Sequence, residues 1–350
     1  MLGLLTLGIT CFMIYTIVKN ALVGKQLSSS LSHSPSLSMI IPIQNEDPFY
    51  HLAWADFFKE TQSFSDLDFI FMASPDHAEY PRLEEFLKDY PRTMLVSASG
   101  GLPSALEELK KQSMKETVVI ADPQVIARKE LLSSLEDLAL TQDQPYFVLP
   151  QISKQTVLGE AVESVAPNLS LVSIFGFRKF RKNISHPLLS LSKGWLCLNK
   201  KIFLETPFHR ISHPSLKLSL AELWEEKEIS YGLAFGEKNL LCLYPRILMD
   251  QLLSQKQSWE RLWKTGERSG FALYLLSLFI WSFPILCFFT HPYWSVASFL
   301  LLSLYRFFSK IVFQTSLRAT FLHPIACSVW LVSLGWWLVE EIRKKYLQAR

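Results

Sequence analysis

An apolar run in the middle of the chain ends in a single carboxylate. Residues 118–121 are apolar and rich in Val and Ile, and Asp122-Pro123 follows them. Such a run is typical of a strand covered on both faces of a parallel sheet, and Pro123 ends the strand because it has no backbone N–H. Ligands of open α/β sheets bind beyond the carboxyl ends of the strands, so Asp122 is placed to meet a cation or a phosphate. The alternative is that Asp122 only caps the turn, or a helix beginning near Ile126.

Strand-like and helix-like stretches alternate along the first third of the chain. This alternation predicts an α/β fold with a doubly wound, mostly parallel sheet. The predicted strands are residues 37–43, 68–73, 93–97 and the central run, and the predicted helices are a stretch through Phe57 and Phe58, residues 81–90 and residues 103–111.

Acidic turns follow three of the predicted strands. Glu46 follows the first strand, Asp76 the second and Asp122 the central one. Carboxylates at successive strand ends converge on one edge of a parallel sheet. We therefore expect these three side chains at a common edge.

The beginning of the chain is apolar enough to enter a membrane. Residues 1–18 carry no charge and are followed by Lys19 and Lys25, which predicts a spanning anchor of marginal length. A cleaved signal peptide is the alternative, but no basic residues precede the apolar stretch and no small-residue cleavage site precedes Lys25. The cations after the stretch predict a cytoplasmic domain.

Three more hydrophobic stretches lie near the end of the chain, at residues 269–290, 292–309 and 319–339, and they predict about three further spans. The middle stretch is the weakest, because Arg306 interrupts it. With three complete spans, the basic tail at 343–345 falls on the side opposite to the other cations. The conflict disappears if the middle stretch is re-entrant or interfacial.

Composition limits the partners of the chain. A net charge of +3 is too small to indicate nucleic acid, and five cysteines without paired or metal-ligand spacing are typical of reduced packing residues. Residues 173–182 interleave phenylalanines with four cations. This pattern fits a membrane interface or a solvated basic loop with buried rings.

The order of these parts resembles membrane-bound GT-A glycosyltransferases of family 2, and within them it is similar to ceramide glucosyltransferase and its bacterial relatives. The resemblance covers roughly residues 1–290. It implies a GT-A-like, Rossmann-like cytoplasmic domain at 38–267, after an anchor at 1–24 and a linker at 25–37, and before a transmembrane region at 268–350.

The resemblance also implies the residues of a donor site. Pro42, Asn45 and Glu46 match the turn that lines the nucleotide pocket of the family. Asp76 matches the carboxylate that contacts the base, and Asp122 matches the first Asp of the metal-binding Asp-x-Asp. The implied cofactors are Mg²⁺ or Mn²⁺ and a nucleotide-sugar such as a UDP-sugar. The second Asp of the motif is replaced by Gln124, and a neutral amide is a poorer ligand for these cations.

The implied catalytic residues depart further from the family pattern. Leu223 stands where the family has the Asp of its Glu-Asp pair, which leaves Glu222 or Glu225 as a substitute for the general base, with Glu222 as the candidate. The Gln-x-x-Arg-Trp signature, which closes the site, is represented by Gln255 and Trp259 without its Arg, and Arg261 is a substitute cation. For Trp259 the alternative is an interfacial aromatic belt.

A phosphate-binding lysine of the family is also missing from residues 101–107. Two functions follow as hypotheses. The first is a membrane-bound inverting glycosyltransferase of the bacterial inner membrane, which moves a sugar from a nucleotide-sugar to a lipid acceptor at the cytoplasmic face. The second is a catalytically inactive, glycosyltransferase-like scaffold or binding protein, because fold likeness does not carry activity. A transporter is the weaker third possibility.

Overall fold

The chain divides into two compact units. The α/β unit comprises Gly24–Gln151 and Ser192–Leu243, and the helical unit comprises Met1–Val23, Ile152–Leu191 and Tyr244–Arg350. The computed structural model describes residues 25–27, 33–43, 51–141, 144–149, 194–211, 216–236, 240–242, 268–313 and 322–348, with runs of one to three residues within 4–15 and 249–263.

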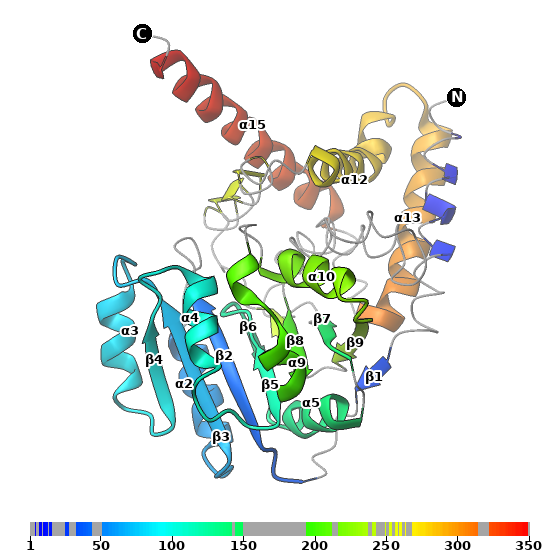
Figure 1. Ribbon diagram of the computed structural model, residues 1–350. Coiled ribbons are helices and arrows are strands. Elements are labelled where there is room, and N and C mark those ends of the chain that lie inside the picture. Colours follow the sequence, from blue (N-terminus) through cyan, green and yellow to red (C-terminus); the bar gives the residue numbers. More distant parts are fainter. Residues whose placement is uncertain are drawn as a thin grey trace. The chain divides into compact units, whose positions relative to one another are not determined.

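One large mixed sheet forms the centre of the α/β unit (Figure 1). Its strand order is β1-β9-β7-β8-β5-β2-β3-β4. All neighbouring pairs are parallel except those of β8, which runs antiparallel to β5 and to β7. The strands are β1 Lys25–Leu27, β2 Leu37–Ile43, β3 Leu67–Ala73, β4 Thr93–Ser97, β5 Thr117–Ile120, β7 Tyr146–Leu149, β8 Trp195–Asn199 and β9 Gly232–Gly236.

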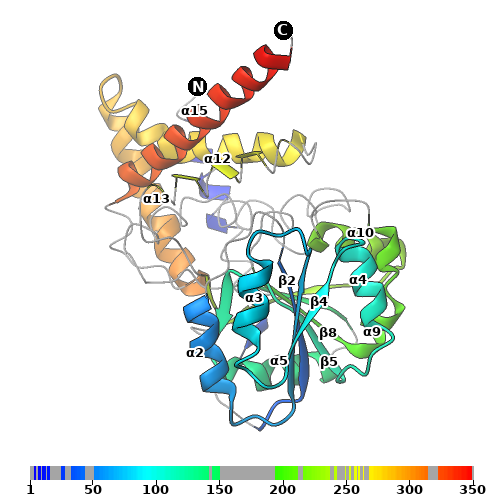
Figure 2. The ribbon, with the colours of Figure 1, turned by 90° about the vertical axis from the view of Figure 1, so that its left-hand side faces the viewer.

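Helices cover both faces of this sheet, so the α/β prediction is confirmed (Figure 2). Helices α2 and α3 lie on one side, and α4 and α9 lie on the other. The helices of the unit are α2 His51–Thr61, α3 Tyr80–Leu87, α4 Leu102–Leu109, α5 Glu130–Thr141, α9 Lys200–Glu205, the 3-10 helix η1 Phe208–Arg210 and α10 Leu216–Glu226.

The segment after Asp122 differs from the alternative interpretation of the sequence. Residues Val125–Ala127 form a strand, β6, which pairs antiparallel with β10, Leu240–Cys242. The next helix, α5, begins only at Glu130. The expectation of a helix near Ile126 was wrong, because residues 125–127 alternate in burial and find a partner strand more than 110 positions away.

Aromatic packing holds α2 on the sheet. Phe58 lies 5.0 Å from Phe69 of β3, and Trp54 lies 5.5 Å from Phe71 of the same strand, measured between ring centroids. Strand β2 is buried along its whole length. Burial of this kind is expected for a strand in the middle of a sheet that is covered on both faces.

The described part of the helical unit contains helices at all three predicted C-terminal positions. They are α12 Arg268–Leu286, α13 Pro292–Phe313 and α15 His323–Gln348. Among the described residues, one helical stretch, Ile325–Leu347, is long and apolar enough to cross a membrane, and Pro292–Leu304 is a shorter apolar stretch. The helices are present, and the number of crossings stays a prediction.

Candidate functional site

The carboxyl ends of the parallel strands form the candidate edge. In the register, Ile43 of β2 pairs with Ala73 of β3, and Ala73 pairs with Ser97 of β4, so these three strands end level. Strand β5 ends at Ile120, opposite Ile40 of β2. The ends of β2, β3 and β5 and the turns after β3 and β5 therefore lie at one edge, which is where open α/β sheets bind ligands. The residues that follow β2, 44–50, lie outside the described residues.

Asp122 closes the turn that follows β5. Its carboxylate Oδ1 accepts a hydrogen bond from the backbone N–H of Gln124 at 2.9 Å, and its carbonyl accepts one from the N–H of Val125 at 3.0 Å. The side chain is half-buried. Asp122 therefore caps its own turn, since an Asp side chain that binds the backbone two residues on is typical of such turns. Its role as a cation ligand stays a prediction.

Two buried indoles fix the backbone of the Asp122 turn. Trp54 Nε1 donates to the Pro123 carbonyl at 3.0 Å, and Trp195 Nε1 donates to the Val125 carbonyl at 3.1 Å. Both tryptophans are at most 1% exposed. A buried carbonyl without a donor is costly, so the two indoles stabilise one backbone conformation of the turn. Sequence reasoning missed both, because one lies about 70 residues before the turn and the other about 70 after it.

The turn after β3 contains Asp76 and His77. Asp76 is exposed, and its backbone N–H donates to Ser74 Oγ at 3.3 Å. His77 is only 7% exposed, and its Nδ1 accepts from the backbone N–H of Glu79 at 3.1 Å. His77 therefore holds the turn while the carboxylate of Asp76 faces solvent.

Glu79 also faces a second histidine at this end of α3. His51 Nε2 lies 3.4 Å from Glu79 Oε2, and burial lowers the pKa of His51.

Helix α4 starts from the turn after β4. Gly101, the residue before the helix, has φ of +84°, a conformation that favours glycine. The lysine of the family motif is absent from this helix start. The lysine that α4 does place in a defined contact is Lys110, directly after its other end.

The position on α10 where the family has its Asp carries no carboxylate. Leu223 is 6% exposed and its neighbour Trp224 is 1% exposed, so both pack into the core. Glu222 is exposed. One residue along a helix turns a side chain by about 100°, which explains why Glu222 and Leu223 point to different surroundings. Glu225 instead accepts a hydrogen bond from the Tyr231 hydroxyl at 3.3 Å.

Trp259 belongs to the core of the helical unit. It is fully buried, its Nε1 donates to Ser333 Oγ at 3.3 Å, and its ring lies 5.7 Å from that of Trp330. The other residues assigned to closing the site, Gln255 and Arg261, lie outside the described residues. So do Asn45, Glu46 and the basic segment 173–182.

The described residues include the β5 turn of the implied metal site. The described residues contain no group of three or more His, Cys, Asp or Glu side chains able to hold a metal ion. At the β5 turn the described donors are one carboxylate, Asp122, and one amide, Gln124. Mg²⁺ is commonly held by one or two carboxylates together with substrate phosphates. This donor set therefore fits a cation that is bound mainly by a diphosphate.

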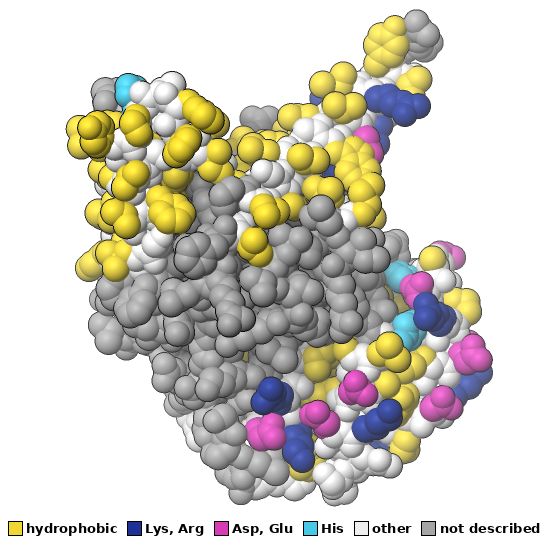
Figure 3. Space-filling view, turned by 180° about the vertical axis from the view of Figure 1, so that it is seen from behind, with side chains coloured by type: hydrophobic (Ala, Val, Ile, Leu, Met, Phe, Trp, Pro, Cys, Tyr) yellow, Lys and Arg dark blue, Asp and Glu magenta, His cyan; other side chains and the backbone are white. Residues whose placement is uncertain are grey.

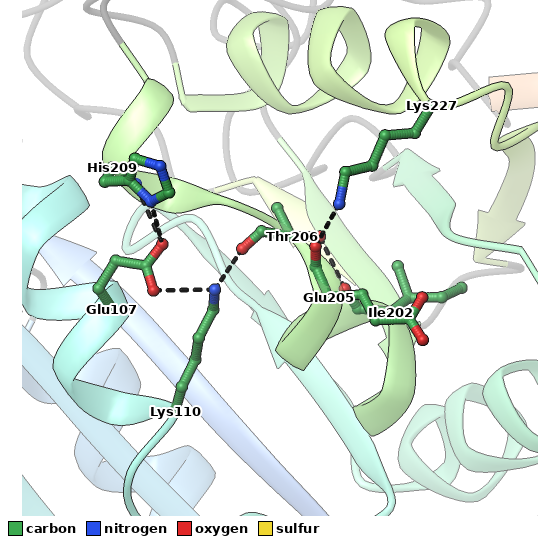
Figure 4. Close-up of polar contacts among 7 residues, drawn as sticks. All are labelled: Glu107, Lys110, Ile202, Glu205, Thr206, His209 and Lys227. Carbon is green, nitrogen blue, oxygen red and sulfur yellow. Dashed lines mark hydrogen bonds and ion pairs between the residues drawn. The ribbon is translucent and has the colours of Figure 1, made fainter.

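Sequence reasoning missed a polar cluster between α4 and the segment after α9 (Figure 4). Glu107 contacts Lys110 Nζ at 2.8 Å, and Lys110 Nζ donates to the Thr206 carbonyl at 2.5 Å. The backbone N–H and the ring Nδ1 of His209 both lie 3.1 Å from Glu107 Oε1. No local sequence motif predicts this cluster, because its members are about 100 residues apart in the sequence.

The cluster continues to α10 through Thr206. The Thr206 hydroxyl donates to the Ile202 carbonyl at 2.7 Å and accepts from Trp224 Nε1 at 3.1 Å, while Lys227 Nζ donates to the Glu205 carbonyl at 2.5 Å. These bonds hold α4, α9 and α10 together. We interpret the cluster as structural.

Replacing either indole with a ring that lacks the N–H should loosen the Asp122 turn. Trp54→Phe and Trp195→Phe are each expected to lower the free energy of unfolding by about 1–3 kcal/mol, because a buried carbonyl loses its donor. Amide hydrogen exchange should quicken at Gln124 and Val125. Trp263→Phe is the control for exchange at the turn, since that ring is 48% exposed and belongs to the helical unit. Unchanged exchange at the turn in both variants would show that the indoles do not hold it.

Glu107 should make the protein sensitive to acid. Burial raises the pKa of Glu107, but hydrogen bonds from Lys110 and from the backbone and ring of His209 outweigh it and lower the pKa from 4.5 to about 2. A carboxyl whose pKa is lower in the folded state stabilises above its unfolded pKa, and the stabilisation is lost as pH falls from about 4.5 to 2.

Glu107→Gln should therefore cost about 1 kcal/mol at neutral pH and flatten the loss of stability between pH 4.5 and 2. The measurement is chemical unfolding across that range. Glu108→Gln, at the exposed neighbouring position, should leave the pH profile unchanged. An equal effect of the two substitutions would contradict the assignment.

Comparisons with known proteins give distant likenesses of structure. No family model and no curated protein matches the sequence. A mannosyltransferase of Pyrobaculum calidifontis in complex with GDP-Man and Mn²⁺ is 13% identical with a TM-score of 0.44, over 93% of this chain and 94% of that one. A 4-diphosphocytidyl-2C-methyl-D-erythritol synthase of Anaerococcus prevotii is 15% identical with a TM-score of 0.37, over 58% of this chain and 88% of that one. At this distance, the fold assignment rests on the strand order and register of the chain itself.

Proposed function

We propose that the α/β unit binds a nucleotide-sugar at the carboxyl edge of its parallel strands and transfers the sugar to a lipid acceptor. The observation that carries the proposal is the Asp122 turn. A carboxylate follows a fully buried strand, and two indole N–H groups hold its backbone. A rigid acidic turn at this edge suits the placement of a diphosphate and its cation.

The residues of the proposed donor site divide into three roles. Pro42, Asn45 and Glu46 would line the nucleotide pocket, and Asp76 would bind the base. Asp122 would hold Mg²⁺ or Mn²⁺. The cation, when bound, would neutralise the charge that develops on the departing diphosphate. The exposed carboxylate of Asp76, next to the buried His77, is compatible with such a role.

Transfer with inversion needs a base for the acceptor hydroxyl. Glu222 is the proposed base, and Gln255, Trp259 and Arg261 would close the acceptor side. The acceptor is proposed to be a lipid because apolar helices occupy the C-terminal region. In this proposal the chain is an integral protein of the bacterial inner membrane with its α/β unit in the cytoplasm.

A second candidate is a membrane protein that binds a nucleotide-sugar or a partner without catalysis. The buried Leu223 favours it, because the position that should carry the base contributes only to the core. Gln124 in place of a second Asp points the same way. The two candidates share the binding step and differ in turnover.

Binding is tested best with Asp122→Asn. The amide oxygen of Asn can still accept the Gln124 N–H, so the turn and the unfolding temperature should be unchanged. The charge that would hold the cation is lost, and Mn²⁺-dependent binding of UDP or GDP to the detergent-solubilised chain should weaken at least about tenfold. Asp137→Asn, at an exposed position of α5, is the matched control. Absence of nucleotide binding in the unchanged chain would refute the proposed donor site.

Turnover separates the two candidates. In the catalytic case Glu222→Gln should reduce release of UDP or GDP from nucleotide-sugars by about 10²-fold or more with binding intact, because a general base contributes about that much. Glu226→Gln is the control, since Glu226 is paired with Arg210 at 2.8 Å. Nucleotide binding without turnover in the unchanged chain would favour the binding protein.

A further inference from the structure

One side of the helical segment before α12 packs against α15 and forms ion pairs with its charged end. The described residues Lys256, Trp259, Glu260 and Trp263 are helical, and their spacing of i, i+3, i+4 and i+7 puts them on one side of a helix. We call this set the connector face. All four of its side chains contact α15, and the sequence interpretation of Trp259 as a site residue did not anticipate this.

Two ion pairs bind the polar part of the connector face. Lys256 Nζ lies 2.5 Å from Glu340 Oε2, and Lys344 Nζ lies 3.4 Å from Glu260 Oε1. The Lys256 side chain is only 12% exposed. Its ammonium also lies 5.0 Å from the centre of the Trp336 ring. The signs of the charges alternate between the two elements, so each cation meets an anion of the other.

Aromatic rings bind the rest of the connector face. Trp259 packs on Trp330, and Trp263 lies 5.6 Å from Trp337, between ring centroids. Lys345 Nζ lies 5.8 Å from the Trp263 ring. Tryptophans interleaved with cations are typical of the level at which a protein leaves the hydrocarbon of a membrane.

The helical unit also presents apolar side chains without a covering layer in the described structure. Figure 3 shows hydrophobic side chains gathered over the helical unit. At the turn between α12 and α13, Phe289 is 90% exposed and Tyr293 is 89% exposed, and Leu300 one to two turns further along is 62% exposed. The occupant that fits a broad apolar surface bounded by charges is a lipid bilayer.

We infer that the connector face and the tail after Glu340 lie on the same side of the membrane, so that the chain crosses an even number of times between them. The paired groups lie 2.5 Å and 3.4 Å apart, so they cannot stand on opposite sides of a hydrocarbon core that is about 30 Å thick. Helices α12, α13 and α15 therefore complete two crossings and not three. This assignment also brings the basic tail at 343–345 to the side of the connector cations, in accordance with the positive-inside rule.

Helix α13 is the element that does not cross. Two cations, Arg306 and Lys310, interrupt its apolar sequence, and a charge inside the hydrocarbon core is costly. Helix α12 has 19 residues and no charge after Arg268, and it leads away from the connector face. Helix α15 leads back to it. The inference rests on the membrane attachment proposed above and not on sugar transfer, so a failed nucleotide titration leaves it intact.

The experiment is thiol labelling of the full-length chain in sealed membranes with a membrane-impermeant polyethylene-glycol maleimide. Single cysteines are introduced at Ser104 of α4, Tyr346 of α15 and Phe289 of the α12–α13 turn, all exposed positions. Labelling is read as one additional mass step over the unchanged chain, which contains five cysteines. The new cysteines of Ser104→Cys and Tyr346→Cys should either both be labelled or both be protected from the reagent. The new cysteine of Phe289→Cys should show the opposite result.

Three outcomes would overturn the inference. Opposite responses of Ser104→Cys and Tyr346→Cys would mean an odd number of crossings. A response of Phe289→Cys like that of the other two would mean that α12 does not cross. A chain that does not sediment with membranes has no such topology.

A double-mutant cycle tests the ion pair between Lys256 and Glu340. Lys256→Met and Glu340→Gln should each lower the unfolding temperature in detergent, and the double variant should lose no more than the worse single one, because both remove the same ion pair. The control is the combination of Lys256→Met with Glu341→Gln. Its decrease in unfolding temperature should equal the sum of the decreases of the two single variants. Additive losses for Lys256→Met and Glu340→Gln would contradict this ion pair.

Discussion

The common direction of β4, β3, β2 and β5 determines where the described donor-site candidates of the α/β unit, Asp76 and Asp122, lie. Parallel strands can be joined only by segments that return to the starting edge, so each turn at the carboxyl edge is free to carry polar residues. β2, β3 and β4 end level with one another, while β5 ends three residues short. The shorter strand leaves room for the Asp122 turn at the same edge, beside the end of β2.

The antiparallel strand β8 completes this arrangement. Its first residue, Trp195, lies at the carboxyl edge because β8 runs against β5. A parallel strand in the same place would put its first residue at the other edge, more than 10 Å away at about 3.3 Å per residue. The indole that holds Val125 is therefore available only because one strand is reversed.

Strands β2, β3, β4 and β5 could be predicted from the sequence, because each is a short apolar run followed by a turn residue, a purely local signal. Strands β6 and β8 could not, since their stability comes from partners far along the chain. The same holds for the Glu107 and His209 contact, 102 positions apart. For the site, sequence reasoning identified the acidic turn at Asp122. It did not identify the two tryptophans that shape it, nor that Trp259 would be buried against α15, because side-chain partners depend on tertiary packing.

The reversed strand also affects how the chain folds during synthesis. When β5 is synthesised, β2 is already available to pair with one of its edges. The strand that pairs with the other edge, β8, is synthesised about 75 residues later. At 5–20 residues per second this interval is about 4–15 s. During this interval the edge of β5 that will face β8 has unpaired N–H and C=O groups. An exposed apolar edge of this kind can pair with strands of other chains. We expect the nascent chain to depend on chaperones most strongly during this interval, and truncations that end before Trp195 to aggregate.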